Sequence, residues 1–182
     1  MNKLEPFFLR IPIGIMSRFR VLFYKLLGMA LGTKNRFEKG RCRRINQIKI
    51  GDQNAFTQGY MLWPIDENHS GKRIIIGNKN YFNRNLMLDA CGTIEIGDYN
   101  MFGPDVYITD SNHTFGSELT LSKAPMNIGK VKIGNNCWIG AKAIILKDVE
   151  LGDGCVVAAG AVVTKGFPAG SIIAGVPAKI IK

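Results

Sequence analysis

Apolar residues recur every six positions through most of the chain. The register is unbroken over the C-terminal third, and the same phase returns in three upstream runs. The members are Ile133, Ile139, Ile145, Leu151, Val157 and Val163, preceded by Ile50, Phe56, Leu62, by Ile76, Phe82, Leu88 and by Ile96, Phe102, Ile108. A period of six fits neither an α-helix nor a long alternating strand. It predicts short strands joined by sharp corners, with three strands to a coil and the apolar side chains pointing inward.

Small residues follow most of these apolar positions. They are Gly134, Gly140, Gly152, Ala158 and Thr164, and small side chains permit tight corners. Cys137 and Cys155 lie 18 positions apart, which is one predicted coil. We therefore expect them in the same site of successive coils, as small core residues and not as a disulfide or metal pair. The sequence predicts an all-β fold of stacked parallel coils.

Two interruptions break the period. One is the polar stretch 66–71, and the longer one separates Ile108 from Ile133. Long insertions in a regular scaffold are uncommon without a functional reason. We expect residues 109–129 to form a protruding loop, and this loop contains His113, one of two histidines in the chain.

The N-terminal part follows a different pattern. Apolar residues at helical spacing start at Ile15 and continue with Phe19, Leu22, Phe23, Leu26 and Leu27. This spacing predicts an amphipathic helix that stops at Gly28 or Gly32. Its apolar face either packs on the domain or on a neighbouring subunit, or lies in a membrane interface. We divide the chain into a basic N-terminal segment, 1–45, and a β-domain, 46–182.

Charge is concentrated at the N-terminus. The chain has 24 basic and 14 acidic residues in 182, a net charge of +10. Residues 1–49 hold 12 of the basic and 2 of the acidic residues, so the excess lies entirely there. Such a segment is either a solvated charged face or a surface for an anionic partner. It has no recognised nucleic-acid-binding fold, so we expect no nucleic-acid partner.

Composition excludes several kinds of site and segment. Two histidines exclude a three-histidine metal site within one subunit, and we expect no metal. The four cysteines form no CxxC pair. The apolar opening resembles neither a signal peptide nor a membrane span. We expect a cytoplasmic protein with reduced thiols, in which residues 1–49 could also make peripheral contact with the inner face of the membrane.

The sequence resembles the hexapeptide-repeat acyltransferases. The resemblance rests on the repeat, on Asn83-Arg84-Asn85, on the loop His113, on the run from Ile133 to Gly140, and on the ending Gly175-Val176-Pro177-Ala178-Lys179. Its nearest members are the galactoside and maltose O-acetyltransferases, together with sugar O-acetyltransferases of surface-polysaccharide synthesis. It implies a left-handed parallel β-helix, a homotrimer, and acetyl-CoA bound between subunits as co-substrate. The first 45 residues lie outside it.

The resemblance also implies site residues. It assigns catalysis to His113, Asn83 and Ala141. It assigns contacts with acetyl-CoA to Trp138, Ala141, Ala159, Thr164, Lys165, Lys179 and Lys182. It assigns the acceptor pocket to Tyr81, Asn83 and Met126. His113 would be the general base, because an imidazole of ordinary pKa near 6.5 accepts the proton of a weakly nucleophilic hydroxyl.

Several of these residues have simpler interpretations. Asn83 could be a corner residue in the left-handed conformation, which Asn tolerates. Trp138 could fill a subunit interface, and Tyr81 or Met126 could serve packing alone. Asp110, three residues before His113, could orient the imidazole as carboxylates do in catalytic triads.

The resemblance implies transfer of an acetyl group from acetyl-CoA to a sugar hydroxyl. The charge of the N-terminus adds a suggestion about the acceptor. A basic segment suggests an acceptor at the membrane surface, such as the glycan of a capsule, O-antigen or exopolysaccharide. The alternatives are an N-acetyltransferase acting on an amino sugar or small molecule, and a non-catalytic β-helix that serves as a scaffold.

Overall fold

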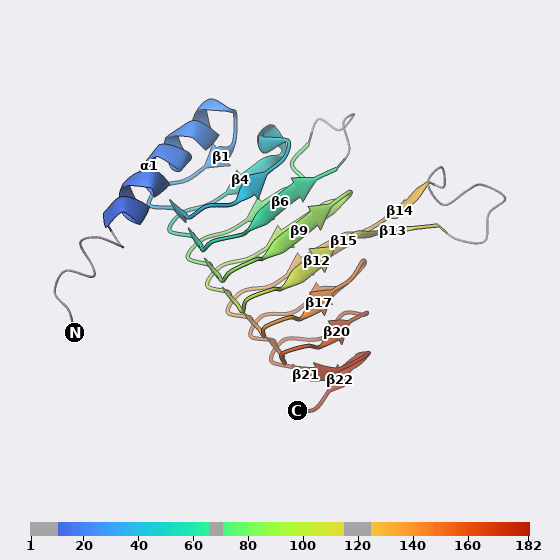
Figure 1. Ribbon diagram of the computed structural model, residues 1–182. Helices are drawn as coiled ribbons and strands as arrows, with labels where there is room; N and C mark the ends of the chain where they lie inside the picture. The colour runs from blue at the N-terminus through green and yellow to red at the C-terminus, as the bar shows by residue number, and fades with distance from the viewer. Residues whose placement is uncertain (1–10, 66–70, 115–124) are drawn as a thin grey trace, which may run out of the picture.

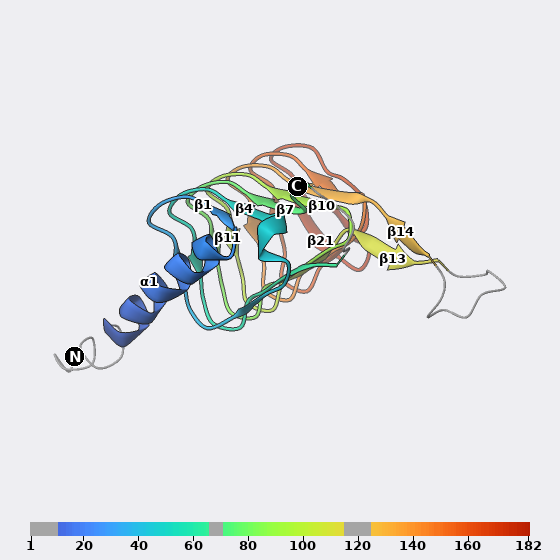
Figure 2. The same cartoon turned by 90° about the horizontal axis from the view of Figure 1, so that it is seen from above.

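A computed structural model describes residues 11–65, 71–114 and 125–182 of the chain. The chain winds into a three-sided column of stacked coils, with a helix at its N-terminal end and an arm that projects from one corner (Figures 1 and 2). The three sides are parallel sheets, which we name sheets A, B and C. Successive strands of the chain enter the three sheets in turn, so three strands make one coil.

Each sheet runs along the column from its N-terminal to its C-terminal end. Sheet A contains β1 (Ala30–Leu31), β4 (Ile48–Ile50), β7 (Ile74–Ile76), β10 (Thr93–Ile96), β15 (Lys130–Ile133) and β18 (Glu150–Leu151). Sheet B contains β2 (Arg36–Phe37), β5 (Ala55–Phe56), β8 (Tyr81–Phe82), β11 (Met101–Phe102), β16 (Trp138–Ile139), β19 (Val156–Val157), β21 (Ile172–Gly175) and β22 (Ala178–Ile180). Sheet C contains β3 (Arg41–Cys42), β6 (Met61–Pro64), β9 (Met87–Ala90), β12 (Tyr107–Thr109), β17 (Ile144–Ile145) and β20 (Val162–Val163). All neighbours pair in parallel except β21 and β22, which close the C-terminal end as an antiparallel pair.

The six-residue period marks the interior of the column, as predicted. Every apolar residue of the repeat is at most 3% exposed. Four of the inward residues of sheet B are phenylalanines whose rings stack along the axis, from Phe37 through Phe56 and Phe82 to Phe102, with centroids 4.7, 4.4 and 4.8 Å apart. Cys137 and Cys155 are buried free thiols at the same site of successive coils, which confirms their prediction as core residues.

A second interior ladder is polar, and the repeat did not predict it. Asn35, Asn54, Asn80 and Asn100 lie at one corner of successive coils and are nearly fully buried. Each side-chain Oδ1 accepts the backbone N–H of the next coil, at 2.8 to 3.0 Å along the asparagines and 2.7 Å at Cys137. Buried polar groups need partners, and this ladder supplies them where the chain turns inside the column.

The predicted helix is present, and it begins earlier than Ile15. Helix α1 spans Ile11–Leu26 and ends ahead of Gly28, whose φ of 89° only glycine adopts readily. Ser17 and Tyr24 are its buried side chains, whereas Phe19 and Leu26 are 63% and 77% exposed. The predicted apolar face therefore points away from the column. Within the described ranges no helix has the length and apolar character needed to cross a membrane.

The first coil of the column lies inside the segment 1–45. Strands β1, β2 and β3 pair with β4, β5 and β6 of the next coil, and a short 3₁₀ helix at Ile45–Gln47 connects the two coils. The basic N-terminal segment therefore contains both α1 and one end of the column.

The predicted loop 109–129 protrudes as an arm. Its described part is an antiparallel pair, β13 (Ser111–His113) and β14 (Met126–Ile128), which leaves the column between β12 of sheet C and β15 of sheet A (Figure 2). The arm therefore originates at the corner between sheets C and A.

Candidate active site

The outer face of sheet B carries an exposed row of apolar side chains. Tyr81, Met101 and Trp138 occupy the same outward position on three neighbouring strands, because Met101 pairs with both Tyr81 and Trp138. Met101 and Trp138 are 58% and 59% exposed. Parallel strands lie about 4.8 Å apart, so the three side chains form a continuous surface. Two residues that the sequence assigned separately, Tyr81 and Trp138, thus share one face.

The corner that follows sheet B carries unpaired backbone donors. In four successive coils the second residue after the sheet-B strand occupies the same place in this corner, and these residues are Arg84, Pro104, Ala141 and Ala159. The N–H of Arg84 donates to the Asn83 side chain at 2.8 Å, and Pro104 has no N–H. The N–H groups of Ala141 and Ala159 donate no hydrogen bond within the described part of the chain. Two neighbouring coils therefore present free donors beside Trp138.

Close packing fixes the Ala141 donor. A Cβ added to Gly103, on the preceding coil, would lie 2.5 Å from the Ala141 nitrogen. Only glycine lets the two backbones approach this closely. The carbonyl oxygen of Ala141 accepts the N–H of Gly160 at 2.8 Å from the other side. The backbone of Ala141 is thus held between two coils.

Asn83 is not the left-handed residue of its corner. The positive φ, 60°, belongs to Asn85, whose Nδ2 donates to Asp105 at 2.9 Å. Asn83 is half-buried, and its Oδ1 accepts the N–H of Arg84. The simpler interpretation of Asn83 as a left-handed corner residue is therefore wrong.

The arm brings His113 and Met126 together. They are cross-strand partners in the β13–β14 pair, and the His113 side chain is exposed. Next to them, Thr114 also bonds across the pair, because its N–H and its hydroxyl both donate to the Pro125 carbonyl, at 3.3 and 2.9 Å. The imidazole is thus carried on a paired strand.

Asp110 closes the base of the arm. Its carboxylate accepts the N–H groups of Cys91 and Gly92 at 2.8 and 2.9 Å, and its carbonyl accepts the N–H of Gly129 at 2.8 Å. Burial raises the pKa of Asp110, against the lowering effect of the two N–H donors. The side chain is fully buried while His113 is exposed. The structure therefore gives Asp110 the role of anchoring the arm and not that of orienting the imidazole.

The positions predicted to contact acetyl-CoA lie on the C-terminal coils. Thr164 and Lys165 follow β20 at the far end of sheet C, and the Lys165 ammonium lies 5.8 Å from the centre of the Phe167 ring. Lys179 lies on β22 and Lys182 is the last residue, and all four side chains are exposed. These residues and Ala159 are available to a ligand that lies along the C-terminal half of the column.

One chain does not bring all the candidates together. Asn83 and Ala141 lie at the corner between sheets B and C, whereas His113 is on the arm at the corner between sheets C and A. The arm extends away from the column (Figures 1 and 2). His113 and Met126 form one group on the arm. A second group lies on sheet B and at the corner between sheets B and C, and it contains Tyr81, Asn83, Trp138 and Ala141. The other histidine of the chain, His69, is given no role in the site and lies outside the described residues.

Sequence reasoning missed two residues of these surfaces. Met101 could have been found from its place before the inward Phe102, which matches that of Tyr81 and Trp138. Asp89 follows the inward Leu88 and is half-buried. Its Oδ2 accepts the Tyr107 hydroxyl at 3.2 Å, and its buried Oδ1 has no hydrogen-bond partner among the described residues. Burial raises the pKa of Asp89.

The sequence matches known proteins. Residues 130–165 match the family described as bacterial transferase hexapeptide (six repeats). Nodulation protein L of Rhizobium leguminosarum bv. viciae is 40% identical over 138 residues, which cover 75% of this chain and 72% of that protein. The galactoside O-acetyltransferase of Lactococcus lactis is 35% identical over 132 residues, 72% of this chain. The chain matches 61% of that enzyme's length and 55% of its Escherichia coli counterpart's.

Solved structures share the fold. A mutant of AntD, an N-acyltransferase from Bacillus cereus in complex with dTDP and coenzyme A, superposes with a TM-score of 0.77 at 22% identity, covering 88% of this chain and 87% of that one. A galactoside acetyltransferase in complex with coenzyme A gives a TM-score of 0.61 at 22% identity, covering 100% and 83%. The left-handed parallel β-helix predicted from the sequence is confirmed.

Proposed function

This chain belongs to the bacterial transferase hexapeptide family, and on that premise we propose that it transfers an acetyl group from acetyl-CoA to a sugar hydroxyl. The observation that carries the proposal is the corner after sheet B. There the free N–H of Ala141 lies beside the exposed Trp138, next to a second free N–H at Ala159. A positioned donor is what an acyl transfer needs, because negative charge develops on the carbonyl oxygen.

The active site is completed by a second copy of the chain. Most outward residues of sheet C are apolar, along the row Met61, Met87, Tyr107, Ile144 and Val162; Arg41 begins that row, and Asp89 faces outward beside it. The outward row of sheet A is largely charged, with Lys49, Glu95, Lys132 and Glu150. Sheets B and C therefore suit subunit contacts and sheet A suits solvent. A homotrimer lets the arm of one subunit, with His113, meet the Trp138 face of its neighbour.

The reaction follows from these groups. His113 accepts the proton of the acceptor hydroxyl as its oxygen attacks the thioester carbonyl. The N–H of Ala141 holds the resulting oxyanion. When the tetrahedral intermediate collapses, the carbon–sulfur bond breaks, and the proton on His113 passes to the leaving thiolate. The products are the acetyl ester and free coenzyme A.

Acetyl-CoA is the donor substrate in this proposal. Trp138 flanks the pantetheine arm, the N–H of Ala159 bonds to it, and Thr164 lies along the same C-terminal coils. Lys165, Lys179 and Lys182 supply charge for the phosphates. On the acceptor side, Tyr81 and Met126 line the pocket, and the Asn83 amide holds the hydroxyl. We place the acceptor in a surface polysaccharide, since the charge of residues 1–49 suits a glycan made at a membrane surface.

The test measures free thiol released from acetyl-CoA with a panel of sugars and amino sugars. We expect release that requires a hydroxyl acceptor. His113→Ala should lower kcat by about 10²–10⁴-fold, which is the contribution of a general base. Asn112→Ala is the matched control, because Asn112 is the exposed neighbour of His113 on β13. It should retain the wild-type rate.

Each result decides one element of the proposal. Absence of thiol release with every acceptor would favour the scaffold interpretation. Release with amines and not with hydroxyls would make the enzyme an N-acetyltransferase. Full activity in His113→Ala, at unchanged oligomeric mass, would remove the base assignment.

A further inference from the structure

Helix α1 docks on the column through the side that carries Ser17, Val21 and Tyr24. The Ser17 hydroxyl accepts the N–H of Phe37 at 2.8 Å, and the hydroxyls of Tyr24 and Tyr60 are hydrogen-bonded at 2.8 Å inside the protein. Arg20 donates to the Phe37 carbonyl at 3.3 Å. These contacts fix which side of the helix faces the first coil. Tyr24 also contacts the Phe37 ring edge-on, with centroids 5.3 Å apart, and Val21 packs against the same core, so the helix caps the column with these residues and leaves its larger apolar face outside.

The opposite side of α1 is apolar and uncovered. Ile15, Phe19, Leu22 and Leu26 follow one another at i, i+4, i+7 and i+11, so they form one row along the helix. Their exposures are 50%, 63%, 56% and 77%, and Phe23 beside them is 55% exposed. The row is continuous, with a concave patch of about 420 Å³ between Phe19 and Leu26.

One edge of this row is cationic. Arg18 and Lys25 lie along it, three and ten positions after Ile15. The helix contains no acidic residue. Between residues 11 and 49 the sequence has ten basic residues against the single acid Glu38. Lys34, Arg36, Lys39, Arg41 and Arg43 of the first coil are exposed at the same end of the molecule.

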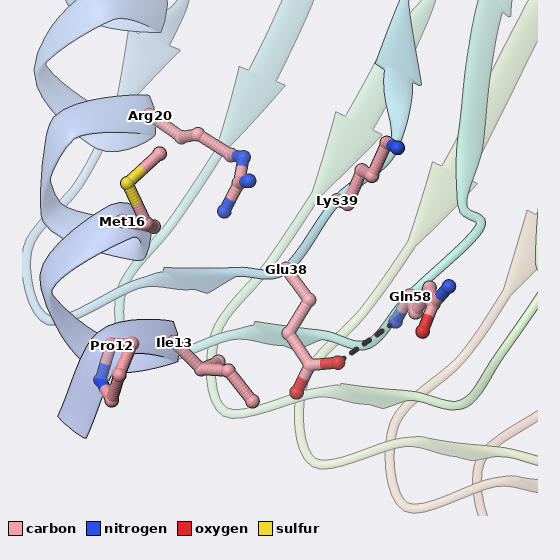
Figure 3. Close-up of a pocket in the computed structure, with 7 residues that line it drawn as sticks. All are labelled: Pro12, Ile13, Met16, Arg20, Glu38, Lys39 and Gln58. Carbon is pink, nitrogen blue, oxygen red and sulfur yellow. Dashed lines mark hydrogen bonds between the residues drawn. The ribbon is translucent and has the colours of Figure 1, made fainter. Parts of the chain in front are cut away.

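A groove extends the apolar surface toward the column. It has a volume of about 280 Å³ and lies between α1 and the first two coils (Figure 3). Ile13 and Met16 line its helix side, and Arg20 and Lys39 stand along its rim. Glu38 is turned toward the Gln58 N–H, which it accepts at 3.1 Å. The helix wall of the groove is therefore apolar, and the column wall carries the polar side chains of Glu38, Lys39 and Gln58.

We propose that α1 is an interfacial helix that docks the protein on a bilayer containing anionic lipids. The row from Ile15 to Leu26 enters the acyl boundary, while Arg18 and Lys25 reach back to the headgroups. The helix is about 24 Å long at 1.5 Å per residue, and it lies along the surface. Charge complementarity selects this occupant, because an apolar row bordered along one edge by cations, beside a basic coil, matches the layering of an anionic membrane surface. The inference does not depend on acyl transfer.

The experiment is co-sedimentation of the full-length protein with phosphatidylcholine vesicles made with and without phosphatidylserine. Deletion of residues 1–45 is unsuitable, because it would remove the first coil together with Phe37. The double variant Phe19→Gln/Leu26→Gln changes only exposed side chains. It should weaken binding to the anionic vesicles about tenfold or more. Arg18→Gln/Lys25→Gln should weaken it about tenfold, and added salt should do the same.

The matched control is Ile181→Gln, which replaces a 66% exposed aliphatic side chain by Gln on the opposite end of the column. It should bind as the wild type does. No binding of the wild type to anionic vesicles overturns the proposal, as does equal binding to neutral ones. The oligomeric mass is measured for every variant. A loss of mass in Phe19→Gln/Leu26→Gln would show that a second copy covers the row, and this also overturns the proposal. Vesicle binding needs no acetyl-CoA, so failure of the proposed acyl transfer is detected separately.

Discussion

The arm that carries His113 should depend on the carboxylate of Asp110. The perturbation is Asp110→Asn, which keeps the size of the side chain. Both carboxylate oxygens of Asp110 accept a backbone N–H, from Cys91 and Gly92. An amide has one acceptor oxygen, so the variant sets its NH₂ group against one of these donors. The change therefore removes one hydrogen bond and leaves a buried N–H without a partner.

The magnitude follows from those two bonds. A hydrogen bond to a charged group contributes about 1.5–3 kcal/mol, and an unsatisfied buried donor costs about 1–3 kcal/mol. Relief of the buried charge offsets part of this loss, because burial raises the pKa of Asp110. We expect the free energy of unfolding to fall by about 1–3 kcal/mol. The raised pKa means that this carboxylate's ionisation opposes folding, so its contribution to stability is greatest at acid pH and declines as pH rises through the folded pKa.

The control is the same substitution at Asp98. Its Oδ1 alone accepts both the N–H and the Nδ2 of Asn78, at 2.7 and 3.1 Å, and Asn135 performs the same role for the next coil with an amide. Asp98→Asn should therefore change stability by less than about 0.5 kcal/mol. The assays are urea unfolding and amide hydrogen exchange of residues 111–114 and 125–128. Exchange should accelerate in Asp110→Asn alone. Equal behaviour of the two variants would refute the anchoring role of Asp110.

Two further predictions concern the corner and the thiols. Gly103→Ala places a Cβ 2.5 Å from the Ala141 nitrogen, so we expect the affinity for coenzyme A, measured by calorimetry, to fall about tenfold or more. The control is Gly160→Ala, which has open space for its Cβ and tests the backbone strain alone. An unchanged affinity in Gly103→Ala would show that the Ala141 N–H does not contribute to cofactor binding. Burial raises the pKa of Cys42 to about 12 and that of Cys137 to about 11, so at pH 8 about a thousandth or less of either thiol is ionised. Mass spectrometry should find both unalkylated by iodoacetamide in the folded protein and modified in urea, with the folded rate rising about tenfold per pH unit; rapid labelling at pH 8 would contradict their burial.

The sequence by itself determined the column. From Ile133 to Val163, the apolar residue at every sixth position marks one side of a coil. This spacing is visible in the sequence of a single chain, without knowledge of any contact. The helix before the column and the arm after Ile108 were predictable for the same reason, since one has a periodicity of its own and the other interrupts the repeat.

The tertiary structure decided how these elements are oriented. The helical period places Phe19 and Leu26 on one face, but the bonds of Ser17 with the first coil and of Tyr24 with the second turn that face outward. The free N–H of Ala141 and the anchoring of Asp110 likewise depend on neighbouring coils, where Gly103, Cys91 and Gly92 lie 18 or more positions away. Insertions of unequal length separate the coils, so a contact between stacked corners has no fixed spacing in the sequence and exists only after the chain has wound.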